Sequence, residues 1–151
     1  LLQAQAQQTG SETTSEVSDR LQVGVIVGEA DSSTAEIQTL NASVRLAAGS
    51  DPINLSKASY TIASSKNATI VNGSQGNGVQ FYQKQGLSGS NILADQEDLM
   101  IVQFNLSKTD GLSPLDPGSK LTIITSAPAG GKSYRQAAVP ERIKTDESYI
   151  L

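Results

Sequence analysis

The spacing of hydrophobic positions changes near residue 21 of this chain. Before that point, apolar or small side chains recur every four residues apart from a gap at Gly10, as they do on one face of a helix. The stripe consists of Leu2, Ala6, Thr13, Val17 and Leu21. Because most of these side chains are small, a partner helix could approach them closely. We therefore predict that residues 1–21 form the last part of an N-terminal α-helix.

Gly10 leaves two interpretations of this helix open. A Gly inside a helix costs about 1 kcal/mol relative to Ala, and packing can offset that cost, so one continuous helix is compatible with the sequence. The stretch Thr9-Gly10-Ser11-Glu12 also fits a capping box, from which a shorter helix would start. We favour the continuous helix, which would serve as a neck in front of residues 22–151.

Beyond the neck, the chain shows the alternation and the β-branched side chains that are typical of strands. Clusters of Gly, Pro, Asn and Asp separate the apolar stretches and indicate turns. The predicted strands cover residues 21–30, 36–48, 59–64, 68–71, 78–84, 98–106, 120–127, 133–139 and 147–151. Residues 51–60 leave room for a short helical turn. This pattern predicts a mainly β chain, folded over residues 22–151 as an immunoglobulin-like antiparallel β-sandwich.

The composition removes most catalytic chemistry. The chain contains no Cys and no His, which excludes disulfides, thiolate metal sites, imidazole ligands and catalytic triads built on His. A net charge of −4 argues against nucleic acid as a partner. No stretch approaches the ~20 apolar residues that span a bilayer. We therefore expect no enzyme and no cofactor.

The stretch APAGGKSY, residues 127–134, ends in the Gly-Lys-Ser of a phosphate-binding P-loop. The small residue that a P-loop requires would fall on Ser126, so Ala127 is one position out. Pro140 then interrupts the chain before a helix of useful length could form. We predict a plain β-hairpin turn here.

Carboxylates form three groups that are candidates for a Ca²⁺ site, because this cation needs several converging oxygens. The groups are Asp95 with Glu97 and Asp98, Glu29 with Asp31, and Asp110 with Asp116. None of them has the spacing of an EF-hand loop. Solvated surface acids are the default interpretation, and a structural Ca²⁺ in a loop is the alternative. A glycosidase pair is disfavoured, since spacing alone cannot place two carboxyl groups across a sugar.

The sequence contains several Asn-X-Ser/Thr acceptors for N-glycosylation, more than expected even though Ser and Asn are common in it. Their asparagines are Asn41, Asn54, Asn67, Asn72 and Asn105. An acceptor must be exposed, and its modification implies passage to the outside of the cell. The alternative interpretation is that these residues simply occupy turns.

The two ends of the chain resemble archaeal flagellins (archaellins). The N-terminal motif comprises Leu2-Gln3, Thr9-Gly10, Glu12, Val17-Ser18 and Leu21-Gln22-Val23. The stretch GSDPINLSKASYTI, residues 49–62, is similar to the Asn-Leu-Ser segment of that family, and VPERIKTDESYIL, residues 139–151, resembles its C-terminal ending. The resemblance covers the ends well and the middle loosely, as expected for a variable surface.

This resemblance implies a structural subunit of the archaeal flagellum (archaellum), an extracellular, glycosylated cell-surface filament that drives swimming. In the family, an apolar N-terminal helix passes from the membrane into the filament axis, where it packs against other copies. We expect such a helix before Leu1, with residues 1–21 as the neck and the β-domain as the outer sheath. The expected partners are other copies of the chain and the basal components of the archaellum.

A binding module is the alternative class. An accessory β-sandwich protein of the archaellum that anchors the motor to the surface layer, or an adhesive archaeal pilin, would share the plan of a helix followed by a sandwich. Such a protein would occur in a few copies, whereas a filament subunit is abundant. An enzyme is the least favoured class.

Overall fold

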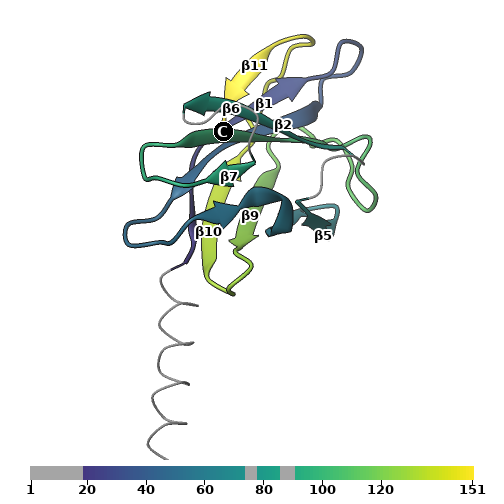
Figure 1. The fold of residues 1–151 in the computed structure, drawn as a ribbon. Helices are drawn as coiled ribbons and strands as arrows, with labels where there is room; N and C mark the ends of the chain where they lie inside the picture. Colours follow the sequence, from purple (N-terminus) through teal and green to yellow (C-terminus); the bar gives the residue numbers. More distant parts are fainter. Residues whose placement is uncertain (1–18, 74–77, 86–90) are drawn as a thin grey trace, which may run out of the picture.

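The computed structural model describes residues 19–73, 78–85 and 91–151. These residues form two main antiparallel sheets that lie face to face (Figure 1). The five-stranded sheet contains, in spatial order, β11 (Ser148–Ile150), β1 (Leu21–Ala30), β2 (Ile37–Leu46), β8 (Leu99–Asn105) and β6 (Val79–Gln85). The four-stranded sheet contains β10 (Lys132–Ala138), β9 (Lys120–Ser126), β4 (Ser59–Ser64) and β5 (Ala68–Asn72). The predicted β-sandwich is therefore confirmed.

A smaller sheet and a helical turn close one end of the sandwich. Strands β3 (Ile53–Asn54) and β7 (Ile92–Leu93) pair with each other, and a single 3-10 turn, Leu55–Lys57, follows β3. The Asn54 side chain accepts a hydrogen bond from the backbone N–H of Ser56 and so caps this turn. The helical turn that residues 51–60 left open is thus present.

Burial that alternates from residue to residue along the strands places the core between the two main sheets. In β9, for example, Leu121, Ile123 and Thr125 are buried, and the residues between them point outward. Tyr60 of β4 and Phe104 of β8 join the sheets through an edge-to-face ring contact, with centroids 5.3 Å apart and planes at 68°. The Tyr60 hydroxyl donates to the Leu55 carbonyl at 3.3 Å, and burial raises the pKa of this phenol.

The predicted strands agree closely with the observed ones, but the predicted neck extends too far. Leu21 was expected on the helical stripe, whereas it is the first residue of β1 and only 1% exposed. Its backbone pairs with Leu46 of β2, so burial of this leucine in the core determines its conformation. Leu2, Ala6, Thr13 and Val17 lie outside the described residues.

The hairpin predicted around Lys132 is confirmed. Residues 127–131 connect β9 to β10, and Lys132 is the first residue of β10 rather than the start of a helix. The Ala127 N–H donates to the Gly131 carbonyl at 2.9 Å across this connection. The stretch that resembles a P-loop therefore lacks the helix N-terminus that phosphate binding would need.

The C-terminal strand β11 is held at the edge of the five-stranded sheet. Gly28 of β1 makes this close approach feasible, because a Cβ there would lie 3.0 Å from Ile37 Cγ2 and 3.1 Å from Leu151 Cδ1. The Tyr149 hydroxyl accepts from the Lys144 N–H at 2.8 Å and donates to Glu147 Oε2 at 3.0 Å. These contacts fix the last turn and strand on the sandwich.

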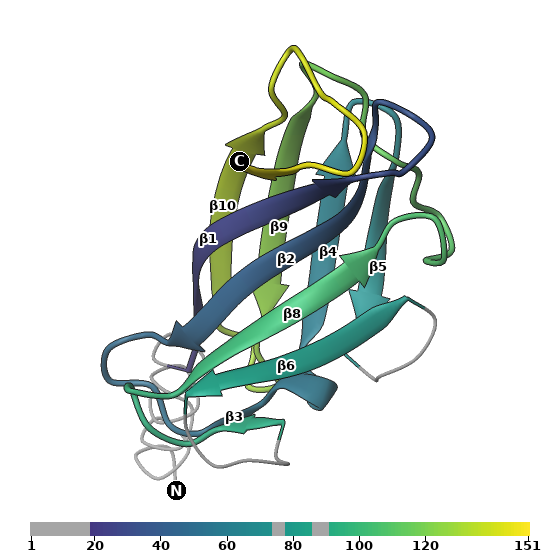
Figure 2. The same cartoon turned by 90° about the horizontal axis from the view of Figure 1, so that it is seen from above.

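Figure 2 looks onto the five-stranded sheet, and the four-stranded sheet lies behind it. Among the described residues, the structure contains no helix with the length and hydropathy that crossing a bilayer requires.

Replacing Phe104 with Ala should destabilise the domain strongly. Phe104 is fully buried (0% exposed) and joins the two sheets, so its loss should cost about 3–5 kcal/mol. Urea unfolding of residues 1–151 measures this change. Tyr134→Ala is the control, because Tyr134 is 61% exposed and its loss should change stability by less than about 0.5 kcal/mol. Equal effects of the two substitutions would contradict the assigned core.

Candidate functional site

Of the carboxylates considered as alternative cation ligands, Asp98 and Asp31 bond to their local backbone, Asp116 pairs with a lysine, and the others are exposed. Asp98 is buried, and its Oδ2 accepts from the backbone N–H groups of Ala94 (2.8 Å) and Asp95 (3.1 Å). It therefore closes the turn before β8, while Asp95 and Glu97 are exposed. In the part of the chain that the structure describes, no three acidic side chains gather into a group that could hold a metal ion.

Asp31 has a similar local role in the loop between β1 and β2. Its Oδ1 accepts from the Ser33 hydroxyl and the Ser33 N–H, each at 2.6 Å, and from the Thr34 N–H at 3.1 Å. The Ser33 hydroxyl is the main reason why the pKa of Asp31 lies below its usual range, with the backbone N–H groups adding to this effect. Glu29 lies two residues earlier on β1 and is exposed.

Asp116 forms an ion pair that the sequence did not predict. Its Oδ2 lies 2.9 Å from Lys66 Nζ, and Glu36 Oε1 lies 3.9 Å from the same ammonium. The hydrogen bond from Lys66 is the main reason why the pKa of Asp116 is lowered, and that same bond raises the pKa of Lys66. This pair joins the β4–β5 turn to the segment before β9. Asp110, the predicted companion of Asp116, is exposed.

Four of the five glycosylation candidates are half-buried and hydrogen-bonded through their side chains. Asn41 Oδ1 accepts from Gln103 Nε2 at 2.9 Å, and Asn67 Nδ2 donates to Ser113 Oγ at 2.7 Å. Asn54 caps the 3-10 turn, as described above. Asn105 Oδ1 accepts from the Ser107 and Lys108 N–H groups at 3.1 and 3.2 Å, which closes the turn after β8.

Asn72 is the exposed member of the five. It is the last residue of β5, the edge strand of the four-stranded sheet, and it pairs with Ser59 of β4. Its amide therefore faces solvent, in the position that an acceptor needs. In the sequence, Asn72 differs from the other four acceptors by opening the Gly- and Asn-rich stretch 72–78. Its exposure comes from its place at a sheet edge.

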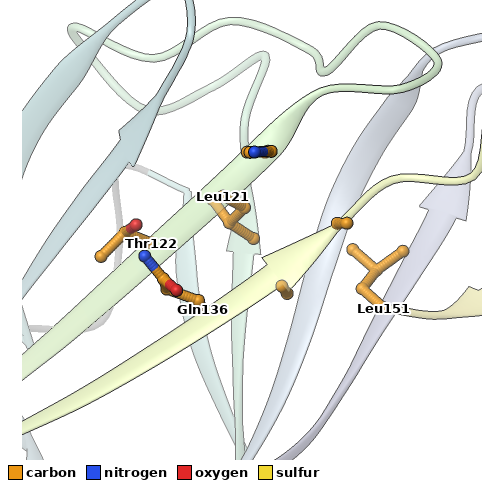
Figure 3. Close-up of a pocket in the computed structure, with 7 residues that line it drawn as sticks. Leu121, Thr122, Gln136 and Leu151 are labelled. Carbon is orange, nitrogen blue, oxygen red and sulfur yellow. The ribbon is translucent and has the colours of Figure 1, made fainter.

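An open groove of about 560 Å³ runs along the first residues of β9 and the last residues of β10 (Figure 3). Thr122 and Gln136 lie side by side on one face of the sheet, Leu121 lies on its other face, and Leu151 approaches from β11. The lining described for this groove offers a hydroxyl, an amide, one lysine and aliphatic groups. Its described lining contains no Asp or Glu side chain that could pair with the lysine as acid and base.

An antiparallel β-sandwich of this kind is shared by many unrelated proteins, so the fold alone does not define the function. The family profile described as archaeal-type flagellin matches residues 1–134 of the chain. Flagellin B1 of Natrialba magadii is 31% identical over 160 residues, which cover 99% of this chain and 79% of that flagellin. The chain belongs to the archaeal-type flagellin family, and the resemblance noted in its terminal motifs is confirmed.

Solved structures share the fold at low sequence identity. Flagellin FlaB1 of Methanocaldococcus jannaschii matches with a TM-score of 0.71 and 14% identity, over 87% of this chain and 95% of that one. The archaeal flagellum of Methanospirillum hungatei matches with a TM-score of 0.70 and 13% identity, over 99% and 82%. The stator complex of FlaF and FlaG from Sulfolobus acidocaldarius reaches 0.52 with 17% identity, over 78% and 87%. Family and fold together identify a structural filament protein of the archaeal flagellum.

Replacing Asp116 with Asn should remove a pH-dependent part of the stability. Because the pKa of Asp116 is lowered in the folded state, its contribution is present above the usual Asp value of about 3.9 and is lost as the pH falls through the lowered value. The variant should therefore melt slightly below the parent at pH 7 and equally with it in strong acid. The pair is exposed, so the difference should be small and should shrink in high salt.

Thermal unfolding between pH 2 and 7 measures this effect. Asp110→Asn is the matched control, because it removes the same charge from an exposed loop position. If the control shows the same pH profile, the loss of stability reflects net charge and not the pair with Lys66.

Proposed function

We propose that this chain is the repeating subunit of an archaeal flagellar filament, with its β-sandwich on the outside and its N-terminal segment directed to the filament axis. The observation that carries this proposal is the extent of the similarity. The family profile covers the N-terminal segment together with most of the sandwich, and the Methanospirillum hungatei flagellum matches 99% of the chain. This coverage supports a role for the whole chain in one assembly.

The junction between the N-terminal segment and the sandwich is built to carry load. Asp19 Oδ1 accepts from the Asp51 N–H at 3.0 Å, and the Arg20 carbonyl accepts from the Ala47 N–H at 3.0 Å. After this clamp, β1 pairs with β2 from Leu21 onward, and its far end, Val27 to Glu29, also pairs with β11. Force on the N-terminal segment would therefore act along β1, against the hydrogen bonds of both neighbouring strands.

The neck residues Leu2, Ala6, Thr13 and Val17 are proposed to contact neighbouring copies. A helical filament needs a contact between two different surfaces that does not close into a ring. An apolar helix upstream of the neck would supply the central part of that contact, because such a surface must be buried in lipid or against other copies. The membrane and the basal components of the archaellum are proposed partners before and during assembly.

The role is mechanical, and the proposal assigns no catalysis, cofactor or metal to the chain. Energy for rotation would come from other components of the motor. Residues 19–151 would form the outer surface of the filament, which lies outside the cell. The absence of His and Cys from the sequence supports this, since it removes imidazole bases and thiolate nucleophiles.

Replacing Val17 with Glu should abolish assembly while leaving the sandwich folded. The buried carboxylate would cost several kcal/mol in a contact between helices. Electron microscopy of cells that make the variant as their only flagellin counts the filaments, and urea unfolding of the chain tests the fold. Gln22→Glu is the control, because it adds the same charge at an exposed position of β1.

The abundance of the chain in sheared, purified filaments separates this function from the alternative. A filament subunit should dominate the protein content and should carry an apolar segment before Leu1, as measured by its mass. A few copies per filament would instead support an accessory sandwich or an adhesin. The stator complex shares the fold with a lower TM-score than the two flagellin structures, which favours the subunit.

Asn72 is the proposed principal glycan acceptor of the folded domain. Its side chain is exposed, whereas the other four acceptors use their side chains in hydrogen bonds. Peptide mass spectrometry of native filaments should find carbohydrate at this position, and Asn72→Gln should lower the mass of the subunit. Asn54→Gln serves as the control. A glycan on Asn41 and none on Asn72 would show that modification precedes folding.

A further inference from the structure

The outer face of the four-stranded sheet is unusually poor in charge. Its outward-pointing residues are Ser59, Thr61 and Ala63 of β4, Ala68, Ile70 and Asn72 of β5, Lys120, Thr122, Ile124 and Ser126 of β9, and Lys132, Tyr134, Gln136 and Ala138 of β10. Most of these side chains are small and uncharged. We call this surface the four-strand face. In Figure 2 it points away from the viewer, behind the five-stranded sheet.

One row of side chains crosses all four strands of this face. Tyr134 pairs with Ile124, Ile124 with Thr61, and Thr61 with Ile70. Tyr134 and Ile70 are 61% and 71% exposed, whereas the two residues between them are half-buried. Apart from the Thr61 and Tyr134 hydroxyls, the row therefore forms an apolar strip with a large exposed side chain at each end. A solvated sheet face would normally carry polar residues at such positions.

The opposite outer face, on the five-stranded sheet, also carries an exposed hydrophobic residue, Ile150, but it has side-chain hydrogen bonds that run between strands. Gln103 of β8 donates to Asn41 of β2, and the Tyr82 hydroxyl of β6 donates to Gln80 Oε1 at 2.5 Å, with Gln103 Oε1 3.3 Å away. These hydrogen bonds link the surfaces of three neighbouring strands, β6, β8 and β2. The four-strand face has one such side-chain bond among its described residues, from Gln136 Nε2 to the Tyr134 hydroxyl at 2.8 Å.

The charges that this face does carry have a single sign. Lys120 and Lys132 lie at opposite ends of the sheet, and no carboxylate lies among its described outward residues. The chain as a whole has a net charge of −4. Copies of an acidic protein repel each other over most of their surface, so they approach most easily where one copy offers only lysines and uncharged groups.

We propose that the four-strand face is the surface by which each sandwich binds the sandwich of a neighbouring copy. This inference rests on the proposed filament. The neighbour presents a different, carboxylate-bearing surface, because a face that paired with itself would close a dimer and end the polymer. The apolar strip supplies the buried centre of the contact, and Lys120 and Lys132 lie at its rim.

The glycan proposed on Asn72 must project from the edge of this face, away from the strip, if a neighbouring copy docks here. A glycan that folds over the strip is the competing cover. Asn72 follows Ile70 by two residues on β5, so a glycan there would start at the edge of the strip. It would already cover the strip in an isolated chain, whereas a neighbouring copy covers it only after assembly. Protection that depends on assembly therefore distinguishes the two.

Two exposed tyrosines provide both the probe and the reference for this test within one chain. Tyr134 lies on the four-strand face, and Tyr82, 43% exposed, lies on the outer face of the five-stranded sheet. Nitration followed by peptide mass spectrometry reports the reactivity of each tyrosine, in dilute chain 1–151 and in intact filaments. We expect the ratio of Tyr134 to Tyr82 modification to fall several-fold on assembly.

Other results of this experiment would overturn the proposal. Equal Tyr134 reactivity in chain and filament would show that this face stays open, while the filament role itself would stand. A Tyr134 that is unreactive in both states would show that something other than a second copy covers the face. If purified filaments lack the chain altogether, the proposed function fails, and this inference fails with it.

A pair of isoleucine variants gives an independent measurement. Ile70 and Ile150 are 71% and 78% exposed, and they lie on edge strands of different sheets. Ile70→Ser should lower the temperature at which filaments dissociate, whereas Ile150→Ser should leave it unchanged, and both chains should unfold like the parent. Equal dissociation temperatures for the two variants would contradict docking through the four-strand face.

Discussion

Burial of aliphatic side chains between the two sheets is the interaction on which this structure depends. The chain has no Cys for disulfides and only 4% aromatic residues, so its core consists mainly of Leu, Ile and Val. Each such side chain contributes about 1.5–3 kcal/mol when it is fully buried. Tyr60 and Phe104 add the one described ring contact, and it joins the two layers at their centre.

Burial of the core also determines which residues form the outer surface of the sandwich. Since side chains alternate along a strand, a register shift of one residue would move every core residue into solvent. The register is therefore fixed, and the outward residues of neighbouring strands form fixed rows. The row from Tyr134 to Ile70 is one consequence. The pairing of β1 with β2, which begins directly after Asp19 and Arg20, is another. A filament subunit needs both a sheath surface of defined composition and a junction that transmits force.

Local patterns were informative wherever one strand or turn decides its own structure. The expected strands 21–30 and 59–64 match β1 and β4 in both bounds, and the hairpin before Lys132 follows from spacing. The prediction was wrong for Leu21, because a helical stripe and a strand pattern overlap there and core burial decides between them. It also missed the Lys66–Asp116 pair, since these residues are 50 positions apart and meet only when the loops of the sandwich come together.

The sequence by itself determined the class of fold, the exclusion of His and Cys chemistry, and the family, because periodicity, composition and terminal motifs are properties of the chain alone. Only the tertiary structure decided which of the five acceptor asparagines faces solvent. It also decided which carboxylates accept hydrogen bonds from the backbone of their own loops. It also brought Ile70, Thr61, Ile124 and Tyr134 into one row. The reason is that exposure and pairing depend on strand order, and strand order is set by packing between distant segments.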